Sequence, residues 1–226
     1  DILTQGFYDG LDFLIKDGWA DGSWYVFLDS DVQAEVLGRM DSKVLNKIQS
    51  MAELKATFKI NYRNSKNVIA NAAKFAEVPA PECKSKLEGT VTYLENRENA
   101  SNFVENAVYE ILSSGVRNPV LLTYQNPNNF LKKSIDNTFM RGLGKSKQQY
   151  FFSEYGDTNI DDANAVRFAN IISFKGLENN DIILHWPLKY YDSHFRPDLY
   201  YTALSRAFNK VYIILDEYEP DSILLS

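Results

Sequence analysis

Several residue types are scarce in this chain of 226 residues, which has one cysteine, Cys83, and two histidines, His185 and His194. A single cysteine excludes a disulfide framework and a cysteine-rich zinc site, and it is typical of a reducing compartment. Two histidines are too few for a histidine-based metal site. No apolar stretch approaches the roughly 18 residues of a membrane span, and no basic-then-apolar leader opens the chain. We therefore expect a cytoplasmic protein with no membrane partner.

Glycine-rich phosphate loops are also missing. The sequence contains neither GxxxxGK[ST] nor a GxGxxG that follows a predicted strand. Such loops cradle phosphates with backbone N–H groups. Their absence excludes a P-loop within this chain and leaves no support for a free-standing Rossmann-type nucleotide binder. No Ser, His and Asp series typical of a hydrolase is present either.

Charge and composition describe an ordinary globular chain. Lys and Arg number 24 against 30 Asp and Glu, a net charge of −6, and hydrophobic residues make up 45%. A chain of this length and composition can bury a hydrophobic core without disulfide bonds or bound metal ions. Its length corresponds to between one and two domains. The acidic balance argues against a protein covered by nucleic acid. It permits a local basic strip, because steering depends on how charge is distributed.

Short apolar runs alternate with helical patterns along the chain. Runs rich in β-branched and aromatic residues predict strands at residues 24–28, 90–94, 120–123, 149–152, 167–172, 181–186 and 211–215. Helical spacing predicts helices at about 7–18, after a capping Ser65, at 101–114 and at 197–207. Strands that are apolar throughout and separated by helices indicate a mainly parallel sheet with helices on both faces. The predicted fold class is therefore an α/β sandwich of the RecA-like kind.

The first segment with chemical character is NYRNS at residues 61–65, between an apolar run and the helix that Ser65 is expected to cap. At such a junction, backbone N–H groups and the Arg63 guanidinium can converge on an anion. Tyr62 offers a flat face for a base. The alternative is a tyrosine at the edge of the core and an arginine paired on the surface.

The second segment is ISFKGLE at residues 172–178, ahead of the predicted strand 181–186. Gly176 allows a sharp turn that leaves Lys175 and Glu178 on the same side. A carboxylate there could accept hydrogen bonds from vicinal ribose hydroxyls. The alternative is an ordinary loop with solvated charges.

The third segment is YYTALSRA at residues 200–207, ahead of the predicted strand 211–215. On a helix beginning near Pro197, Thr202 and Arg206 lie four residues apart on one line. Small residues allow the helix to pack closely, so we expect Arg206 to emerge at a defined place.

In this order, the three segments resemble motifs IV, V and VI of superfamily 1 DNA helicases of the UvrD/Rep/PcrA kind, which lie on the second RecA-like domain of those enzymes. VLLTY at 120–124 resembles an intervening strand that ends in a threonine, and WYVFLDSDVQ at 24–33 resembles motif III. The resemblance covers almost the whole chain. It implies that residues 1–53 are the trailing part of a first RecA-like domain, after the Walker B segment, and that 54–226 are the second. The P-loop and the metal-binding Asp-Glu pair are then expected before residue 1.

The resemblance also implies roles for individual residues. Tyr62 matches a tyrosine that stacks on adenine, and Arg63 an arginine that contacts the γ-phosphate. Glu178 matches a ribose-binding glutamate, and Arg206 matches an arginine finger, a group worth about 10³–10⁵ in rate. Gln33 matches the motif III glutamine that links nucleotide state to DNA. The implied cofactor is ATP with Mg²⁺, whose protein ligands are expected upstream of residue 1.

Single-stranded DNA is the implied partner, with contacts expected from Thr123, Asn170, Ser173 and Lys175. Two positions depart from the family, because a threonine and a histidine usual before KGLE are replaced by Asn170 and Ile172. Asn170 can still donate to a phosphate, whereas Ile172 cannot. With a net charge of −6, we expect weak and strongly salt-dependent binding.

The function expected from the sequence is the C-terminal part of an ATP-dependent DNA helicase or translocase, in which Arg63 and Arg206 draw two lobes together. The chain alone should not turn over ATP. The alternative is a helicase-like nucleic-acid-binding or scaffold protein without motor activity. Residues 1–53 would lack the neighbours of their strand, so we expect an exposed or rearranged segment that pairs with a second copy.

Overall fold

The computed structural model describes residues 3–27, 41–56, 58–96, 103–124, 151–154, 165–187 and 196–216. The chain forms two compact units, Asp1–Lys59 and Ile60–Ser226. The division predicted after residue 53 assigned each part to a helicase lobe, and that assignment stays a prediction.

The described residues of the first unit form the helices α1 (Gln5–Leu14), α2 (Gly18–Asp21) and α3 (Ser42–Met51). The Thr4 hydroxyl caps α1 by accepting from the Phe7 N–H at 3.3 Å. The predicted helix end at Gly18 was too late, because α1 stops at Leu14 and Gly18, with φ of +70°, opens α2 instead. Helices α2 and α3 were not predicted.

The strand predicted at 24–28 is wrong for the residues that the structure describes, and Leu28 lies outside them. Residues 24–27 adopt no regular structure. Tyr25 is 89% exposed and Phe27 is 82% exposed, in keeping with an exposed N-terminal segment. An apolar run becomes a strand only when neighbouring strands satisfy its backbone groups.

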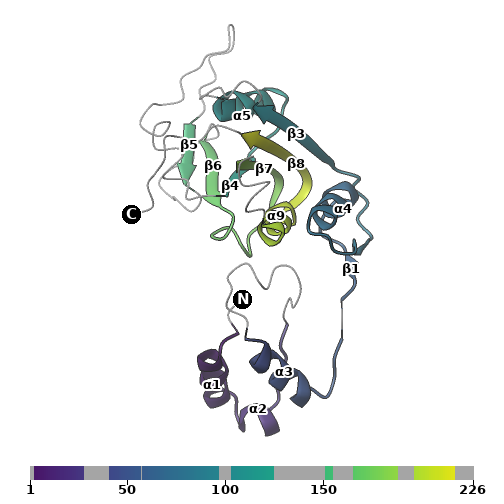
Figure 1. The fold of residues 1–226 in the computed structure, drawn as a ribbon, viewed down its shortest axis with the longest axis vertical. Helices are drawn as coiled ribbons and strands as arrows, with labels where there is room; N and C mark the ends of the chain where they lie inside the picture. Colours follow the sequence, from purple (N-terminus) through teal and green to yellow (C-terminus); the bar gives the residue numbers. More distant parts are fainter. Residues whose placement is uncertain are drawn as a thin grey trace. The chain divides into compact units, whose positions relative to one another are not determined.

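The second unit is built on a six-stranded sheet in the order β3-β8-β7-β4-β6-β5 (Figure 1). Its strands are β3 (Thr90–Asn96), β4 (Val120–Thr123), β5 (Phe151–Glu154), β6 (Ala165–Asn170), β7 (Asn179–Pro187) and β8 (Ala207–Asp216). Every pairing between neighbouring strands is parallel. A separate short pair joins β1 (Ile60–Asn61) to β2 (Glu82–Cys83).

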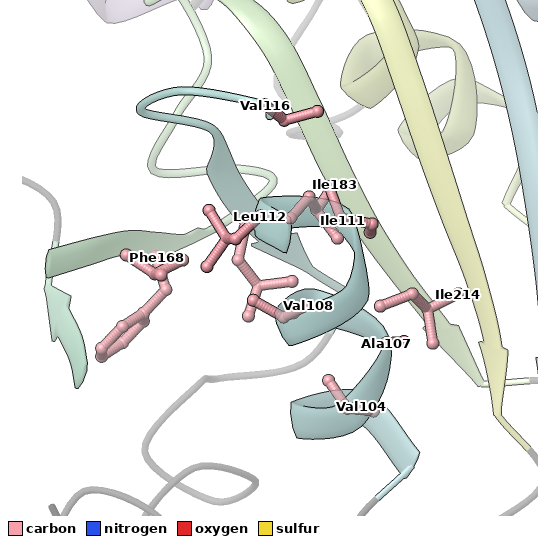
Figure 2. Packing of buried hydrophobic residues seen from close by; sticks show 11 residues of the cluster. Val104, Ala107, Val108, Ile111, Leu112, Val116, Phe168, Ile183 and Ile214 are labelled. Atoms are coloured by element: carbon pink, nitrogen blue, oxygen red, sulfur yellow. The ribbon is translucent and has the colours of Figure 1, made fainter. Parts of the chain in front are cut away.

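Helices cover both faces of this sheet. On one face, α5 (Phe103–Ser113) packs Val108 and Leu112 against side chains that include Ile183 of β7 (Figure 2). On the other face, Trp186 of β7 contacts the ring of Tyr200, whose helix α9 (Pro197–Leu204) lies beside α4 (Lys66–Phe75). Residues 183 and 186 are separated by an odd number of positions, so their side chains point to opposite faces. The predicted α/β class, with a parallel sheet between helices, is confirmed and is consistent with a RecA-like domain.

The predicted boundaries vary in accuracy. Strand β4 has the predicted bounds, and β3, β7 and β8 contain the predicted runs. Strand β6 begins and ends two residues earlier than predicted. Strand β5 ends at Glu154, two residues later than predicted, and the predicted residues 149 and 150 lie outside the described ones. Helix α9 ends at Leu204, three residues short of the prediction, because the chain enters β8 at Ala207.

Within the described ranges, no helix is long and apolar enough to cross a membrane.

Candidate functional site

The NYRNS segment forms a tight turn held by the side chain of Asn61. The Asn61 Oδ1 atom accepts from the backbone N–H groups of Arg63 and Asn64, each at 2.9 Å. Tyr62 projects outward and is 68% exposed. An asparagine that bonds its own downstream backbone is a common way to close a turn.

The backbone N–H groups after Arg63 are used within the fold, which corrects one expectation. Ser65 N–H donates to Phe208 O at 2.7 Å, and Lys66 N–H donates to Leu87 O at 3.1 Å. Ser65 occupies the predicted N-cap position of α4, yet its hydroxyl donates to Asn209 O at 3.0 Å instead of capping the helix. An anion at this turn would therefore meet the Arg63 guanidinium and not a ring of backbone donors.

The same turn is bonded to the chain around Arg206. The Asn64 Nδ2 atom donates to Ser205 O at 2.9 Å and to Ala207 O at 2.6 Å. These residues are more than 140 positions apart in the sequence. The first and third predicted segments are therefore in direct contact.

The second predicted segment joins them. Arg63 forms an ion pair with Glu178, with 3.0 Å between Nη2 and Oε1. Asn179, the next residue, donates its N–H to Arg206 O at 3.0 Å. Tyr62, Arg63, Glu178 and Arg206 thus belong to three segments that meet at the amino ends of β7 and β8.

Arg206 is buried, which corrects the expectation that it emerges from a helix. It lies in the turn between α9 and β8 and is only 4% exposed. Its Nε donates to Thr202 O at 3.2 Å and its Nη2 to Ser205 Oγ at 3.1 Å. The guanidinium folds back on the last turn of α9 because the helix ends before Arg206 is reached.

The ion pair between Arg63 and Glu178 is partly exposed to solvent. The Arg63 side chain is 47% exposed and that of Glu178 is 29% exposed. Ion pairs with this exposure typically stabilise a protein by about 0.2–1 kcal/mol, so a phosphate could replace the carboxylate at small cost. Beside the turn, the hydrogen bond from Lys66 to Glu88, together with the charge of that carboxylate, raises the pKa of Lys66. The surface pairing of Arg63 also agrees with the alternative stated for this residue from the sequence.

Among the residues predicted to contact DNA, Thr123 and Asn170 lie at the carboxyl ends of their strands. Thr123 and Asn170 are the last residues of the neighbouring strands β4 and β6 and are register partners. Asn170 Oδ1 accepts from the Ser173 N–H at 2.7 Å, so a contact with phosphate would have to come from its Nδ2 group. Thr123 is buried, Ser173 is exposed and Lys175 is half-buried in the following turn. Their role in binding DNA stays a prediction.

Two implied features cannot be placed at this site. Gln33 lies outside the described residues. No group of three or more His, Cys, Asp or Glu side chains that could hold a metal ion occurs in the part of the chain that the structure describes. The Glu178 carboxylate at the turn is paired with Arg63.

Sequence reasoning missed the asparagines that assemble the site. Asn61 and Asn64 close and dock the turn, and Asn179 ties β7 to Arg206. Asn61 and Asn64 flank Tyr62 and Arg63 in the sequence, and because asparagine is typical of turns this pattern could have predicted the turn. His185 was also passed over, although it is the register partner of Thr123 and is buried.

Comparison with known proteins adds little to these observations. No protein-family model and no curated protein matches the chain. Among solved structures, it is similar to the C-terminal domain of a possible DNA helicase from Lactobacillus plantarum WCFS1, with 12% identity and a TM-score of 0.42. That alignment covers 70% of this chain and 90% of the other. A likeness of this size identifies no family, so the fold class rests on the sheet order and the site on its own contacts.

Proposed function

We propose that this chain supplies one half of an ATP site in a DNA helicase or translocase, together with part of its single-stranded DNA track. The observation that supports the proposal is that three segments distant in the sequence, those of Arg63, Glu178 and Arg206, are in contact with one another. Two arginines, one carboxylate and one exposed tyrosine, carried by these adjoining segments, are groups suited to binding a nucleoside triphosphate. Guanidinium groups bind phosphate oxygens in planar, bidentate geometry.

In the proposed site, Tyr62 stacks on the base, Glu178 accepts from the ribose hydroxyls and Arg63 exchanges its carboxylate partner for the γ-phosphate. Arg206 stabilises charge on the transferring phosphoryl group once the site closes. The P-loop and the Mg²⁺ ligands come from another RecA-like domain, because the sequence has no such loop. Binding and release of ATP would then alternately close and open the two lobes.

The proposal is tested by titrating the chain with ATP and Mg²⁺ to millimolar concentration while backbone amides are followed by NMR. We expect shifts at Tyr62, Arg63 and Glu178 that saturate, with a lower affinity for ADP because it lacks the γ-phosphate. Arg63→Ala should weaken ATP binding about tenfold, as expected for one lost charge-assisted hydrogen bond. Arg196→Ala is the matched control, since the Arg196 side chain is similarly exposed (45%) and also pairs with a carboxylate, that of Asp198.

Two results would contradict the proposal. One is the absence of any amide shift at these residues, and the other is robust metal-dependent ATP hydrolysis by the chain alone. Binding of a labelled oligo-dT, measured by fluorescence anisotropy, tests the DNA track. The expected affinity is weak and falls with a slope of about −0.7 in log[salt] per phosphate contacted.

The second candidate function is a helicase-like nucleic-acid-binding or scaffold protein without motor activity. It is favoured by the state of the two arginines, since Arg63 is paired with Glu178 and Arg206 is buried. DNA binding that persists while ATP produces no shift would select this candidate.

A further inference from the structure

The Asn64 side chain forms more hydrogen bonds than the side chains of Tyr62 and Arg63, the two predicted site residues of the same turn. Asn64 is 1% exposed. Its Nδ2 atom donates to the carbonyl oxygens of Ser205 and Ala207, the residues before and after Arg206. Its Oδ1 accepts from Asn61 Nδ2 at 2.9 Å. Both donors and the acceptor of this one group are thus engaged.

The backbone of Arg206 is held from a second direction. Arg206 O accepts from the Asn179 N–H, and Arg206 N–H donates to Ala203 O at 3.2 Å. The backbone around Arg206 is therefore held by two attachments, one through Asn179 from the Glu178 segment and one through Asn64 from the Arg63 segment.

We propose that Asn64 is a positioning residue that sets the place of Arg206 relative to Arg63 and so transmits nucleotide contact at the Tyr62–Arg63 turn to the buried arginine. This inference rests on the proposed function. A displacement of the turn by a phosphate on Arg63 is carried to both peptide groups that flank Arg206, because the carboxamide is bonded to each of them.

The carboxamide of asparagine has the hydrogen-bonding groups that this position requires. Two carbonyl oxygens face the same side-chain atom, and the NH₂ group of asparagine carries the two N–H donors that they require. An aspartate of the same shape would place an acceptor against two acceptors. A serine would be too short to reach both carbonyls and has a single donor.

The experiment compares Asn64→Asp with Asn67→Asp in the full chain. Asn67 is the matched control, because it lies three residues further along, is exposed and donates from Nδ2 to Gly89 O, away from Arg206. The Arg206 Nε–H resonance is followed by NMR while ATP and Mg²⁺ are added to wild type, Asn64→Asp and Asn67→Asp. Hydrogen exchange at the Arg206 Nε–H, which donates to Thr202 O, reports the position of the guanidinium directly.

We expect ATP to shift the Arg206 Nε–H resonance in wild type and in Asn67→Asp, and to shift it at least twofold less in Asn64→Asp, because the carboxamide that joins the turn to both peptide groups beside Arg206 is lost. Exchange at the Arg206 Nε–H should accelerate in Asn64→Asp and remain as in wild type in Asn67→Asp. A residue with a merely structural role would leave the ATP-induced shift of the Arg206 Nε–H resonance in Asn64→Asp the same as in wild type.

Three results would overturn the inference: an ATP-induced shift of the Arg206 Nε–H resonance in Asn64→Asp as large as in wild type, an unchanged Nε–H exchange rate in that variant, or failure of both Asn64→Asp and the milder Asn64→Ala to fold. Absence of ATP binding by the wild type would instead overturn the proposed function. The two failures are therefore distinguishable.

Discussion

Two runs in this molecule that were both predicted as strands adopt different structures. Residues 24–27, in the first unit, form no strand and leave Tyr25 and Phe27 exposed. Residues 181–186, in the second unit, form the middle of β7 and are buried. Strand β7 is hydrogen-bonded to β4 on one side and to β8 on the other. The difference shows that hydrophobicity supplies the tendency to be buried, whereas backbone pairing with neighbours decides whether a strand forms.

The two units also differ in how their cores are built. The first unit has a small cluster of Tyr8, Trp19, Val44 and Ile48, in which the Tyr8 and Trp19 rings stack with centroids 5.3 Å apart. The second unit packs a whole sheet between helices. A small cluster depends on each of its members, so the first unit should respond most strongly to a single truncation.

The largest predicted effect is that of Trp19→Ala on the first unit. Removing a buried tryptophan costs about 4 kcal/mol of unfolding free energy, and the change also removes the hydrogen bond from Trp19 Nε1 to Tyr8 O. We expect amide protection to be lost in α1, α2 and α3 and retained in β7 and β8, as measured by hydrogen exchange with mass spectrometry.

Phe13→Ala is the control for that measurement, because Phe13 is 90% exposed. It should change the free energy of unfolding by less than about 0.5 kcal/mol. Loss of protection in β7 and β8 upon Trp19→Ala would show that the two units do not unfold independently.

The second predicted effect concerns the sheet. Ile183→Ala removes a fully buried side chain that packs against α5, and should cost about 3 kcal/mol in denaturant unfolding of the second unit. Ile172→Ala, at a position that is 45% exposed, is the matched control and should cost less than about 0.5 kcal/mol. Equal costs would mean that the centre of the sheet does not carry the stability of this unit.

The third predicted effect tests the docking of the NYRNS turn. A Cβ added at Gly89, whose φ is +68°, would lie 1.8 Å from Ser65 Oγ and 2.4 Å from Asn209 O. Gly89→Ala should therefore cost about 2 kcal/mol through clash and backbone strain together. It should also weaken ATP binding in the titration described above.

Gly115→Ala separates these two contributions. Gly115 has φ of +93° and nothing within 4 Å of an added Cβ, so it reports backbone strain alone, about 1 kcal/mol. If Gly89→Ala cost no more than Gly115→Ala, the close contact between Ser65 and Asn209 would not hold the turn in place.

The smallest predicted effect is a pH dependence in the second unit. Burial, followed by the negative charge of Asp181, raises the pKa of Tyr212 above its ordinary value of 10.0. The folded protein then holds the phenol proton more tightly than the unfolded chain, so this stabilisation is present below pH 10 and is lost as the pH rises through the folded pKa. Tyr212→Phe should reduce the loss of stability between pH 9 and pH 11, measured by urea unfolding.

Asp181→Asn provides the second arm of that test. Removing the charge should lower the pKa of Tyr212, which can be followed in NMR spectra of tyrosine labelled at Cζ. A pKa of Tyr212 that does not move would mean that burial alone accounts for the shift.

Much of the second unit could be predicted because its local signals agree with its tertiary environment. The run at 120–123 is apolar, bounded by turns and central in the sheet, and its bounds were predicted correctly. Helix α9 was predicted too long, because the pattern continues to Ala207 whereas the pairing of Asn179 with Ala207 draws that residue into β8. Helix α3 was not predicted, although Asp41 caps it and Val44 and Ile48 lie at helical spacing.

The candidate site shows the same division. Tyr62, Arg63, Glu178 and Arg206 were selected from sequence, and the structure brings their segments together. The pairing of Arg63 with Glu178, the burial of Arg206 and the bridging carboxamide of Asn64 could not be predicted. Each of these depends on where segments more than 100 residues apart meet.

By itself, the sequence determined the class of the fold, the order of most strands and helices, and the residue types available for binding a phosphate. Those properties follow from periodicity and side-chain chemistry, which are local. The tertiary structure decided which apolar runs became strands, which arginine remained at the surface and which was buried, and which carbonyl groups Asn64 joins. Hydrogen bonds and burial depend on neighbours in space, and parallel pairing brings together neighbours that are distant in the chain.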